Sequence, residues 1–280
     1  MGSKQLIVTA DDFGLTEGVN QAIVRAHREG IVTSASLMIN GGAAESAVEL
    51  ARQNPTLDIG LHLNLTNDPF SLAANHRGRD LEREIRSQIE AALGTGLNIS
   101  HLDGHKHVHI IPAVLKLVVR LTGKYGIRAL RTMNARTPRL TSLLRRNPAS
   151  RKAILKQYAF AQGARFLWRL SSPKPIVGPD HFYGITETGF LDRAVFETII
   201  QDLSSGVHEV MAHPGYMDAG LRKLPTRLLE QRQREFELLT SPGIRRLIQE
   251  AGVQLISYRD LVETYGNHRT DSLLHRYSAV

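Results

Sequence analysis

Short β-rich runs alternate along the chain with stretches of helical periodicity. Residues 6–12 (LIVTADD) are apolar and β-branched, and residues 16–29 repeat apolar positions at helical spacing up to Gly30. Further predicted strands lie at residues 32–39, 57–65, 97–105, 127–133, 208–214 and 253–258, and further predicted helices at residues 43–53, 81–93, 112–125 and 226–250. Regular β-α alternation of this kind is typical of a (β/α) barrel or of a doubly wound sheet.

The positions of the polar residues favour the barrel. Chemically useful side chains sit at the ends of successive predicted strands: Asp11, Asp12, Asn40, His62, His105, Arg131 and His213. In a barrel these strand ends converge on one face, whereas in a doubly wound sheet they would be spread along an edge. We therefore expect residues 1–280 to form one α/β domain, a TIM-like (β/α) barrel that is irregular and has seven or eight strands.

Composition narrows the chemistry and the location. A chain of 280 residues can bury a full core, and no run approaches the roughly 18 apolar residues of a membrane span. The N-terminal residues lack the pattern of a secretory signal, so we expect a cytoplasmic protein. There are no cysteines, which excludes thiolate ligands. Any bound metal must be held by His, Asp or Glu.

Most of the net charge of +8 comes from one segment, a predicted basic helical insertion at residues 135–179. It contains ten basic residues and no acidic one: Arg136, Arg139, Arg145, Arg146, Arg151, Lys152, Lys156, Arg165, Arg169 and Lys174. Leucines, aromatic residues and the only tryptophan are interspersed. Such a helix can rest on an anionic membrane surface, but it could equally be a solvated excursion that covers the barrel mouth. No base-reading motif accompanies it, so we expect no nucleic acid partner.

The adjacent carboxylates Asp11 and Asp12 close the first predicted strand. One carboxylate of such a pair can bind a metal while the other stays free to move a proton. The alternative is a structural role, because an aspartate before Phe-Gly-Leu-Thr-Glu also suits a turn or a helix N-cap.

The stretch HLDGHKHVH at residues 101–109 holds four histidines. All four would share one face of an extended strand, which is implausible for four ligands, so the strand must end inside the stretch. Gly104 marks that end and leaves His105 at the strand tip. His101 then lies deeper, towards the barrel interior, and His107 and His109 belong to the following loop.

Asp12, His62 and His105 would provide one ligand from each of three strand tips. Two imidazoles and a carboxylate suit one divalent ion, with Zn²⁺, Mn²⁺, Fe²⁺ or Co²⁺ fitting better than Mg²⁺. Alone, His62 is more typical of a hydrogen-bonded core histidine. Supporting or substrate-contacting candidates are Asp103, His107, His109, His101 and Arg131.

Two further strand-tip residues have candidate roles. His213, in AHPGY, could protonate a leaving amine, or could simply be a turn histidine before Pro-Gly. Arg131 could orient Asp11 by charge pairing, or could belong to a structural ion pair.

The ordered motifs of the chain resemble those of the YdjC-like (ChbG-type) carbohydrate deacetylase family. They are ADDFG at 10–14, Asn20, GIVTS at 30–34, GLHLNLT at 60–66, HLDGHKHVHIIP at 101–112 and AHPGY at 212–216. The resemblance implies a (β/α) barrel, a divalent metal usually described as Mg²⁺, and removal of an N-acetyl group from an amino sugar. It places the ligands on Asp12, His62 and His105, the base on Asp11 and the acid on His213.

The basic insertion points to one branch of that family. TADDFG and HKH resemble the hopanoid-biosynthesis (HpnK) branch, which implies an N-acetylglucosaminyl group on a polycyclic lipid and a peripheral position at the inner membrane face. Glycan and glycolipid substrates both remain open, as does a homo-oligomer.

These residues predict metal-assisted amide hydrolysis, in which Asp11 takes a proton from the attacking water and His213 protonates the leaving amine. A rival from another class is a non-haem iron oxygenase, which also uses two histidines and one carboxylate. A third hypothesis is a non-catalytic basic module that binds lipid or sugar. We disfavour it because every expected catalytic position is filled.

Overall fold

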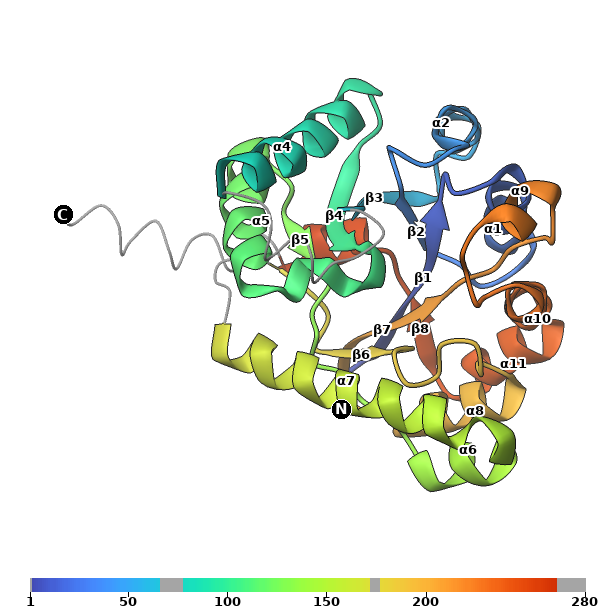
Figure 1. Ribbon diagram of the computed structural model, residues 1–280. Coiled ribbons are helices and arrows are strands. Elements are labelled where there is room, and N and C mark those ends of the chain that lie inside the picture. Colours follow the sequence, from blue (N-terminus) through green and yellow to red (C-terminus); the bar gives the residue numbers. More distant parts are fainter. Residues whose placement is uncertain (1, 66–77, 172–176, 266–280) are drawn as a thin grey trace.

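Eight parallel strands form one curled sheet with helices around it (Figure 1). The structure is a computed structural model that describes residues 2–65, 78–171 and 177–265. Within them the strands are β1 (Lys4–Phe13), β2 (Ser34–Leu37), β3 (Asp58–Leu63), β4 (Ile99–Gly104), β5 (Ala129–Leu130), β6 (His181–Tyr183), β7 (Gly206–Ala212) and β8 (Val253–Leu255). The strand order is β5-β4-β3-β2-β1-β7-β6, and β8 pairs with β1.

The irregularity of the sheet lies at β8 and at the two outer strands. β8 pairs with Lys4–Leu6, the first part of β1, whereas β2 pairs with β1 only from Thr9 onwards. β8 therefore fills the space beside β1 that the short β2 leaves. At the other side, two isolated parallel bridges, Ala129 with Val177 and Ala135 with Phe182, join the β5 and β6 ends of the sheet. The predicted irregular (β/α) barrel is confirmed.

Helices surround the sheet (Figure 1). They are α1 (Glu17–Glu29), α2 (Ala44–Arg52), α4 (Gly78–Gly94), α5 (Pro112–Tyr125), α6 (Leu140–Arg146), α7 (Arg151–Ser171), α8 (Arg193–Asp202), α9 (Ala219–Lys223), α10 (Glu230–Thr240) and α11 (Pro242–Glu250), with 3-10 turns η1 (His105–Ile110) and η2 (Pro148–Ser150). Local signals fix their ends. The Thr16 side chain accepts the Val19 N–H to cap α1, and Gly126 ends α5 with a φ of 76°.

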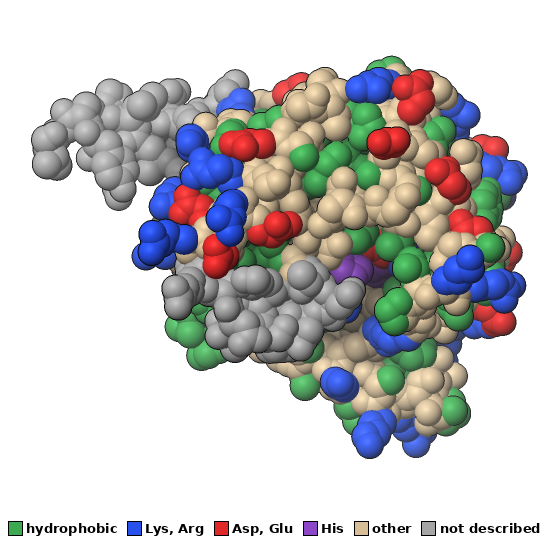
Figure 2. Space-filling model, turned by 45° about the horizontal axis from the view of Figure 1, so that its top comes forward, with side chains coloured by type: hydrophobic (Ala, Val, Ile, Leu, Met, Phe, Trp, Pro, Cys, Tyr) green, Lys and Arg blue, Asp and Glu red, His purple; other side chains and the backbone are tan. Residues whose placement is uncertain are grey.

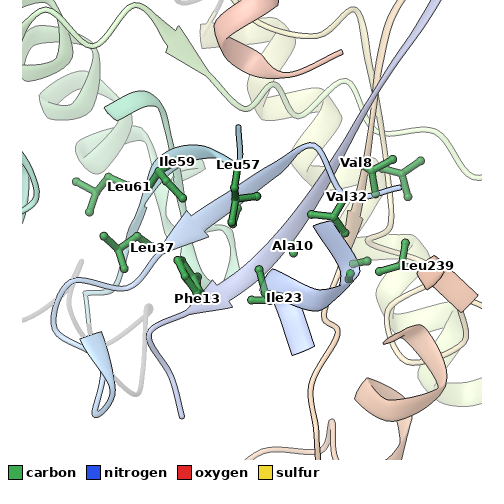
Figure 3. Close-up of a cluster of buried hydrophobic side chains, with 14 of the residues drawn as sticks. Val8, Ala10, Phe13, Ile23, Val32, Leu37, Leu57, Ile59, Leu61 and Leu239 are labelled. Carbon is green, nitrogen blue, oxygen red and sulfur yellow. The ribbon is translucent and has the colours of Figure 1, made fainter. Parts of the chain in front are cut away.

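Alternation along the strands separates an apolar outer layer from a polar interior. On β1, Val8 and Ala10 pack outwards with Ile23 of α1 in the main hydrophobic cluster, part of which Figure 3 shows. Thr9 and Asp11 lie on the opposite side of the strand, because successive strand residues point to opposite faces. Side chains of polar residues thus line the barrel interior and lead to its C-terminal face.

Two sequence predictions need correction. The predicted helix at residues 226–250 is two helices, α10 and α11, because Pro242 has no N–H and forces the extended backbone seen at Ser241 (φ −65°, ψ 124°). The predicted strand at residues 32–39 is shorter, since only Ser34–Leu37 pairs. β6 was not predicted at all. Among the described residues no helix is long and apolar enough to cross a membrane. Thr66 and Lys174 lie outside the described residues.

Candidate metal centre and active site

The C-terminal ends of the strands surround a hollow in which histidine side chains are visible (Figure 2). Asp12 belongs to the end of β1 and His62 to the end of β3, while His105 follows directly after β4 and His213 directly after β7. The strand that carries the histidine-rich stretch ends at Gly104, as predicted. Residues far apart in the sequence are therefore neighbours here.

Asp12, His62 and His105 lie together. One ligand atom from each falls within 4.8 Å of the other two. Asp12 Oδ1 is 3.0 Å from Nδ1 of His105 and 3.4 Å from Nε2 of His62. Asp12 and His62 are buried, and His105 is half-buried at the hollow. One carboxylate and two imidazoles from three strand tips suit a divalent ion that keeps positions for water and substrate.

Asp103 orients His62. Nδ1 of His62 lies 2.7 Å from Asp103 Oδ1, and both side chains are buried. With Nδ1 donating its N–H to the carboxylate, Nε2 faces Asp12, an arrangement that commonly orients metal-binding histidines. Burial alone would lower the pKa of His62, but Asp103 and Asp11 outweigh it and raise this pKa to about 10. A metal held at Nε2 would displace the proton that this raised pKa retains.

Arg232 of α10 holds the other oxygen of Asp12. Its guanidinium donates to Asp12 Oδ2 at 2.5 Å, and both side chains are only 2% exposed. Burial would raise the pKa of Asp12, yet Arg232 and His105 hold it well below its usual range. Asp12 also has a φ of 68°, in the left-handed region that costs a non-glycine residue free energy. Oδ1 is thus the oxygen that faces the histidines.

Arg131 follows β5 and binds Asp11 with two parallel hydrogen bonds, of 2.8 Å to Oδ2 and 2.7 Å to Oδ1. Its Nη1 also lies 2.5 Å from Asp103 Oδ2. Asp11, His62 and Asp103 form a second group with metal-binding geometry. Because the Arg131 guanidinium already pairs with both carboxylates of this second group, the Asp12 group is the better candidate for a metal site.

A further carboxylate supports Arg131 from below. Glu209 of β7 accepts the Arg131 Nε–H at 3.0 Å, the Thr9 hydroxyl at 2.8 Å and the Tyr258 hydroxyl at 2.6 Å. Arg131 is fully buried and meets three carboxylates. Burial raises the pKa of Asp11, and Arg131 only partly opposes this rise. Asp11 is therefore a fixed and comparatively basic carboxylate next to the candidate ligand Asp12.

His213 lies 12% exposed at the hollow and is held by Glu235 of α10. The His213 backbone N–H donates to Glu235 Oε2 at 2.6 Å, and His213 Nδ1 is 3.9 Å from the same oxygen. Burial lowers the pKa of His213 to about 3 and raises that of Glu235 to about 7. Burial therefore disfavours the charged form of both side chains.

The other three histidines of HLDGHKHVH do not belong to the ligand group. His101 is fully buried and stacks on Tyr258 at 3.8 Å, above Gly60. His107 and His109 lie in η1, edge to face at 6.3 Å, and His107 stacks on Phe160 of α7. Burial lowers the pKa of His101 and of His109 to about 3, and that of His107 well below its usual range. These shifts favour neutral imidazoles, and Nε2 of His101, Nδ1 of His107 and both ring nitrogens of His109 are buried without a hydrogen-bond partner among the described residues.

Arg232 and Glu235 were absent from the sequence predictions. Both come from the stretch QRQREFELL of α10, whose charges resemble a solvated helix face. Both are buried, at 2% exposure each. The only signal in the sequence was their place three residues apart, which puts two charged side chains on one face of a helix.

Comparison with known proteins agrees with this geometry. A family model described as YdjC-like protein matches residues 5–250. The chain belongs to this family. The resemblance of the sequence motifs is thereby confirmed, while the matches do not single out the hopanoid branch.

Two curated relatives and one solved structure are informative. A protein from Brevibacillus brevis named carbohydrate deacetylase is 34% identical over 277 residues, which cover 92% of this chain and 99% of the relative. A carbohydrate deacetylase from Geobacillus stearothermophilus is 33% identical, covering 91% and 96%. A crystal structure from Enterococcus faecalis V583, of a protein proposed to cleave cellobiose phosphate, has a TM-score of 0.72 at 28% identity and covers 92% of this chain and 99% of its own.

Proposed function

We propose that this YdjC-like chain is a metal-dependent carbohydrate deacetylase that hydrolyses the acetamide of an N-acetylated amino sugar. The observation that carries the proposal is the group Asp12, His62 and His105 beside the fixed carboxylate of Asp11. Full-length similarity to proteins named carbohydrate deacetylase supports the substrate class.

Asp12, His62 and His105 would hold the metal, because their ligand atoms converge and Asp103 and Arg232 fix their orientation. When bound, a divalent ion polarises the acetyl carbonyl and lowers the pKa of a coordinated water. Imidazole ligands favour Zn²⁺, Mn²⁺ or another transition metal, and the family resemblance favours Mg²⁺. The proposal therefore specifies one divalent ion.

Asp11 would take the proton of the attacking water. Arg131 donates to both of its oxygens, but each carboxylate oxygen can accept a second hydrogen bond. The rigid two-point pairing keeps the carboxylate in place, and the raised pKa makes it a better base.

His213 would deliver a proton to the departing sugar amine. Its own pKa is too low for it to be charged at rest, so the proton would come from Glu235, 3.9 Å from His213 Nδ1. In this scheme Glu235 stores the proton and His213 transfers it at the hollow. His101, His107 and His109 have no part in the scheme.

The oxygenase hypothesis is less well supported. Those enzymes usually take their ligands from a double-sheet barrel, whereas this site lies at the strand ends of a parallel (β/α) barrel. The hypothesis of a non-catalytic module fits poorly with Asp11 and Asp12, two buried carboxylates that Arg131 and Arg232 hold in place.

Acetate release tests the proposal. The metal-loaded protein should release acetate from chitobiose or from an N-acetylglucosaminyl lipid, with activity retained under anaerobic conditions. Activity on the lipid alone would favour the hopanoid substrate. His105→Ala should lose both turnover and bound metal, with Lys106→Ala as a neighbouring control. Full metal occupancy in the His105 variant would show that the ligand assignment is wrong.

A further inference from the structure

Helix α7 has two apolar faces. Its inner face packs Ile154, Ala161 and Ala164 against the barrel. Its outer face also carries large apolar side chains: Leu155 is 48% exposed, Phe166 62% and Leu170 67%. Four of the five large hydrophobic side chains that are exposed in the described residues belong to this helix. Burial of the inner face leaves the outer one without a partner.

The outer apolar residues form a stripe. Positions in a helix advance by about 100° each, so Leu155, Phe166 and Leu170 lie within about 60° of one another, with Ala159 and Gly163 between them. The stripe runs about 22 Å along the helix, given 1.5 Å per residue. Figure 1 shows α7 as a long outer helix, and no described helix covers its outer side. A stripe this long exceeds the scattered apolar residues of an ordinary surface.

Basic residues flank the stripe. Arg151, Lys152, Lys156 and Arg169 lie along the helix, and residues 135–179 contain no carboxylate. Nearby Asp192 is already paired with Arg146 at 2.5 Å. The helix therefore combines exposed apolar side chains with basic residues and contributes no carboxylate of its own.

We propose that the outer face of α7 is a docking surface for an anionic lipid bilayer. An amphipathic helix with this composition lies in the bilayer plane, its apolar stripe among the acyl chains and its cations at anionic headgroups. A protein partner would require complementary carboxylates in fixed places, whereas a lipid surface provides mobile negative charge along the whole stripe.

Docking in this way would bring the mouth of the barrel close to the bilayer. Phe160, on the side of α7 next to the stripe, stacks on His107, two residues after the ligand His105. A sugar carried on a lipid would then be presented at the site without leaving the membrane. This consequence rests on the proposed function, whereas the docking itself does not.

Co-sedimentation with vesicles tests the docking without any activity assay. The protein should bind vesicles of phosphatidylcholine with phosphatidylglycerol and not vesicles of phosphatidylcholine alone. Lys152→Gln with Lys156→Gln should weaken binding about 30-fold, since each basic residue near the surface contributes about fivefold. Phe166→Ser with Leu170→Ser should weaken it at least about tenfold.

Arg222→Gln with Lys223→Gln, exposed on α9 away from α7, removes the same charge and should leave binding unchanged. Unaltered circular dichroism confirms that each variant folds. No binding to anionic vesicles would overturn the proposal. Equal losses in the α9 control, or unchanged binding in the Phe166 and Leu170 variant, would also overturn it, as they indicate non-specific attraction of a basic protein. A dimer that this variant dissociates, without vesicle binding, would assign the stripe to a second copy of the chain.

Discussion

Replacing Arg232 by methionine should destabilise the metal-free protein strongly. The substitution keeps most of the side-chain volume and removes the cation that lies 2.5 Å from Asp12 Oδ2. Both side chains are 2% exposed, so water cannot replace the lost partner. Removal of one partner from a buried ion pair costs about 3–5 kcal/mol. The free energy of unfolding of Arg232→Met in the presence of a chelator should fall by this amount.

A divalent metal should restore part of that loss. Arg232 and the metal both neutralise Asp12, so removal of the arginine leaves more of the carboxylate's charge for the ion. At about 100 times its dissociation constant, a metal adds about 2.7 kcal/mol to the wild type. The variant should gain about 1–3 kcal/mol more than this, a coupling typical of two linked sites. The difference between variant and wild type should therefore shrink when Mn²⁺ or Zn²⁺ is added.

Urea denaturation followed by circular dichroism, with chelator and with metal, measures both quantities. Arg193→Met is the matched control, since it breaks an exposed pair with Glu197 at 63% and 35% exposure and should cost about 0.5 kcal/mol or less. If Arg232→Met does not fold, Arg232→Lys is the second variant. It keeps the positive charge, so its loss of unfolding free energy should be smaller than the roughly 3–5 kcal/mol expected for methionine and larger than that of Arg193→Met. Equal losses with and without metal would refute the coupling. A loss of unfolding free energy below about 1 kcal/mol in chelator would show that the buried Asp12–Arg232 pair does not stabilise the protein as reasoned.

Three further outcomes are expected. Asp11→Asn should lower kcat by about 10²–10⁴ while metal content by atomic absorption stays unchanged, as for loss of a general base. Glu187→Gln should stabilise the protein at pH 8 but not at pH 5, because burial raises the pKa of Glu187 to about 7 from 4.5. The wild type therefore loses up to about 3 kcal/mol of unfolding free energy as the pH rises from about 4.5 to 7, and the variant does not. The same difference in urea midpoint between variant and wild type at both pH values would contradict this. Gly60→Ala should lower the thermal midpoint and reduce the free energy of unfolding by about 1–3 kcal/mol, because the added Cβ would lie 2.3 Å from the His101 ring, which stacks on Tyr258. An unchanged midpoint would show that the stacked rings can move aside.

The barrel could be predicted because each strand and helix carries a local pattern. The run LIVTADD and the helix start at Thr16 need no distant contact to be recognised, and Gly104 marks the end of β4. The break at Pro242 was also visible in the sequence and was overlooked. β6 was not visible, because three residues carry no period and its pairing with β7 depends on the whole sheet.

The convergence of Asp12, His62 and His105 could be predicted for the same reason, as strand tips meet on one face of a barrel. The groups that orient them could not. Arg232 and Glu235 look like surface charges on α10 until the end of β1, some 220 residues earlier, packs against that helix. In the sequence, Glu209 likewise has no feature that sets it apart from the rest of its strand. Only the folded barrel brings its carboxylate into contact with Arg131.

The buried charges of the site explain why a divalent ion suits it. Four carboxylates, Asp11, Asp12, Asp103 and Glu209, are joined by the contacts described above to two guanidiniums, Arg131 and Arg232. With neutral imidazoles this cluster has an excess of two negative charges, which is the charge of one divalent ion. Burial raises the pKa of Asp11 against the opposing effect of Arg131, with Asp103 adding to the rise. Asp103 and Asp11 raise the pKa of His62 against its burial. Without a metal, proton uptake by these groups thus partly offsets the excess negative charge. A bound dication would neutralise that charge and make the extra protons unnecessary. Metal binding should therefore release protons and become tighter as the pH rises.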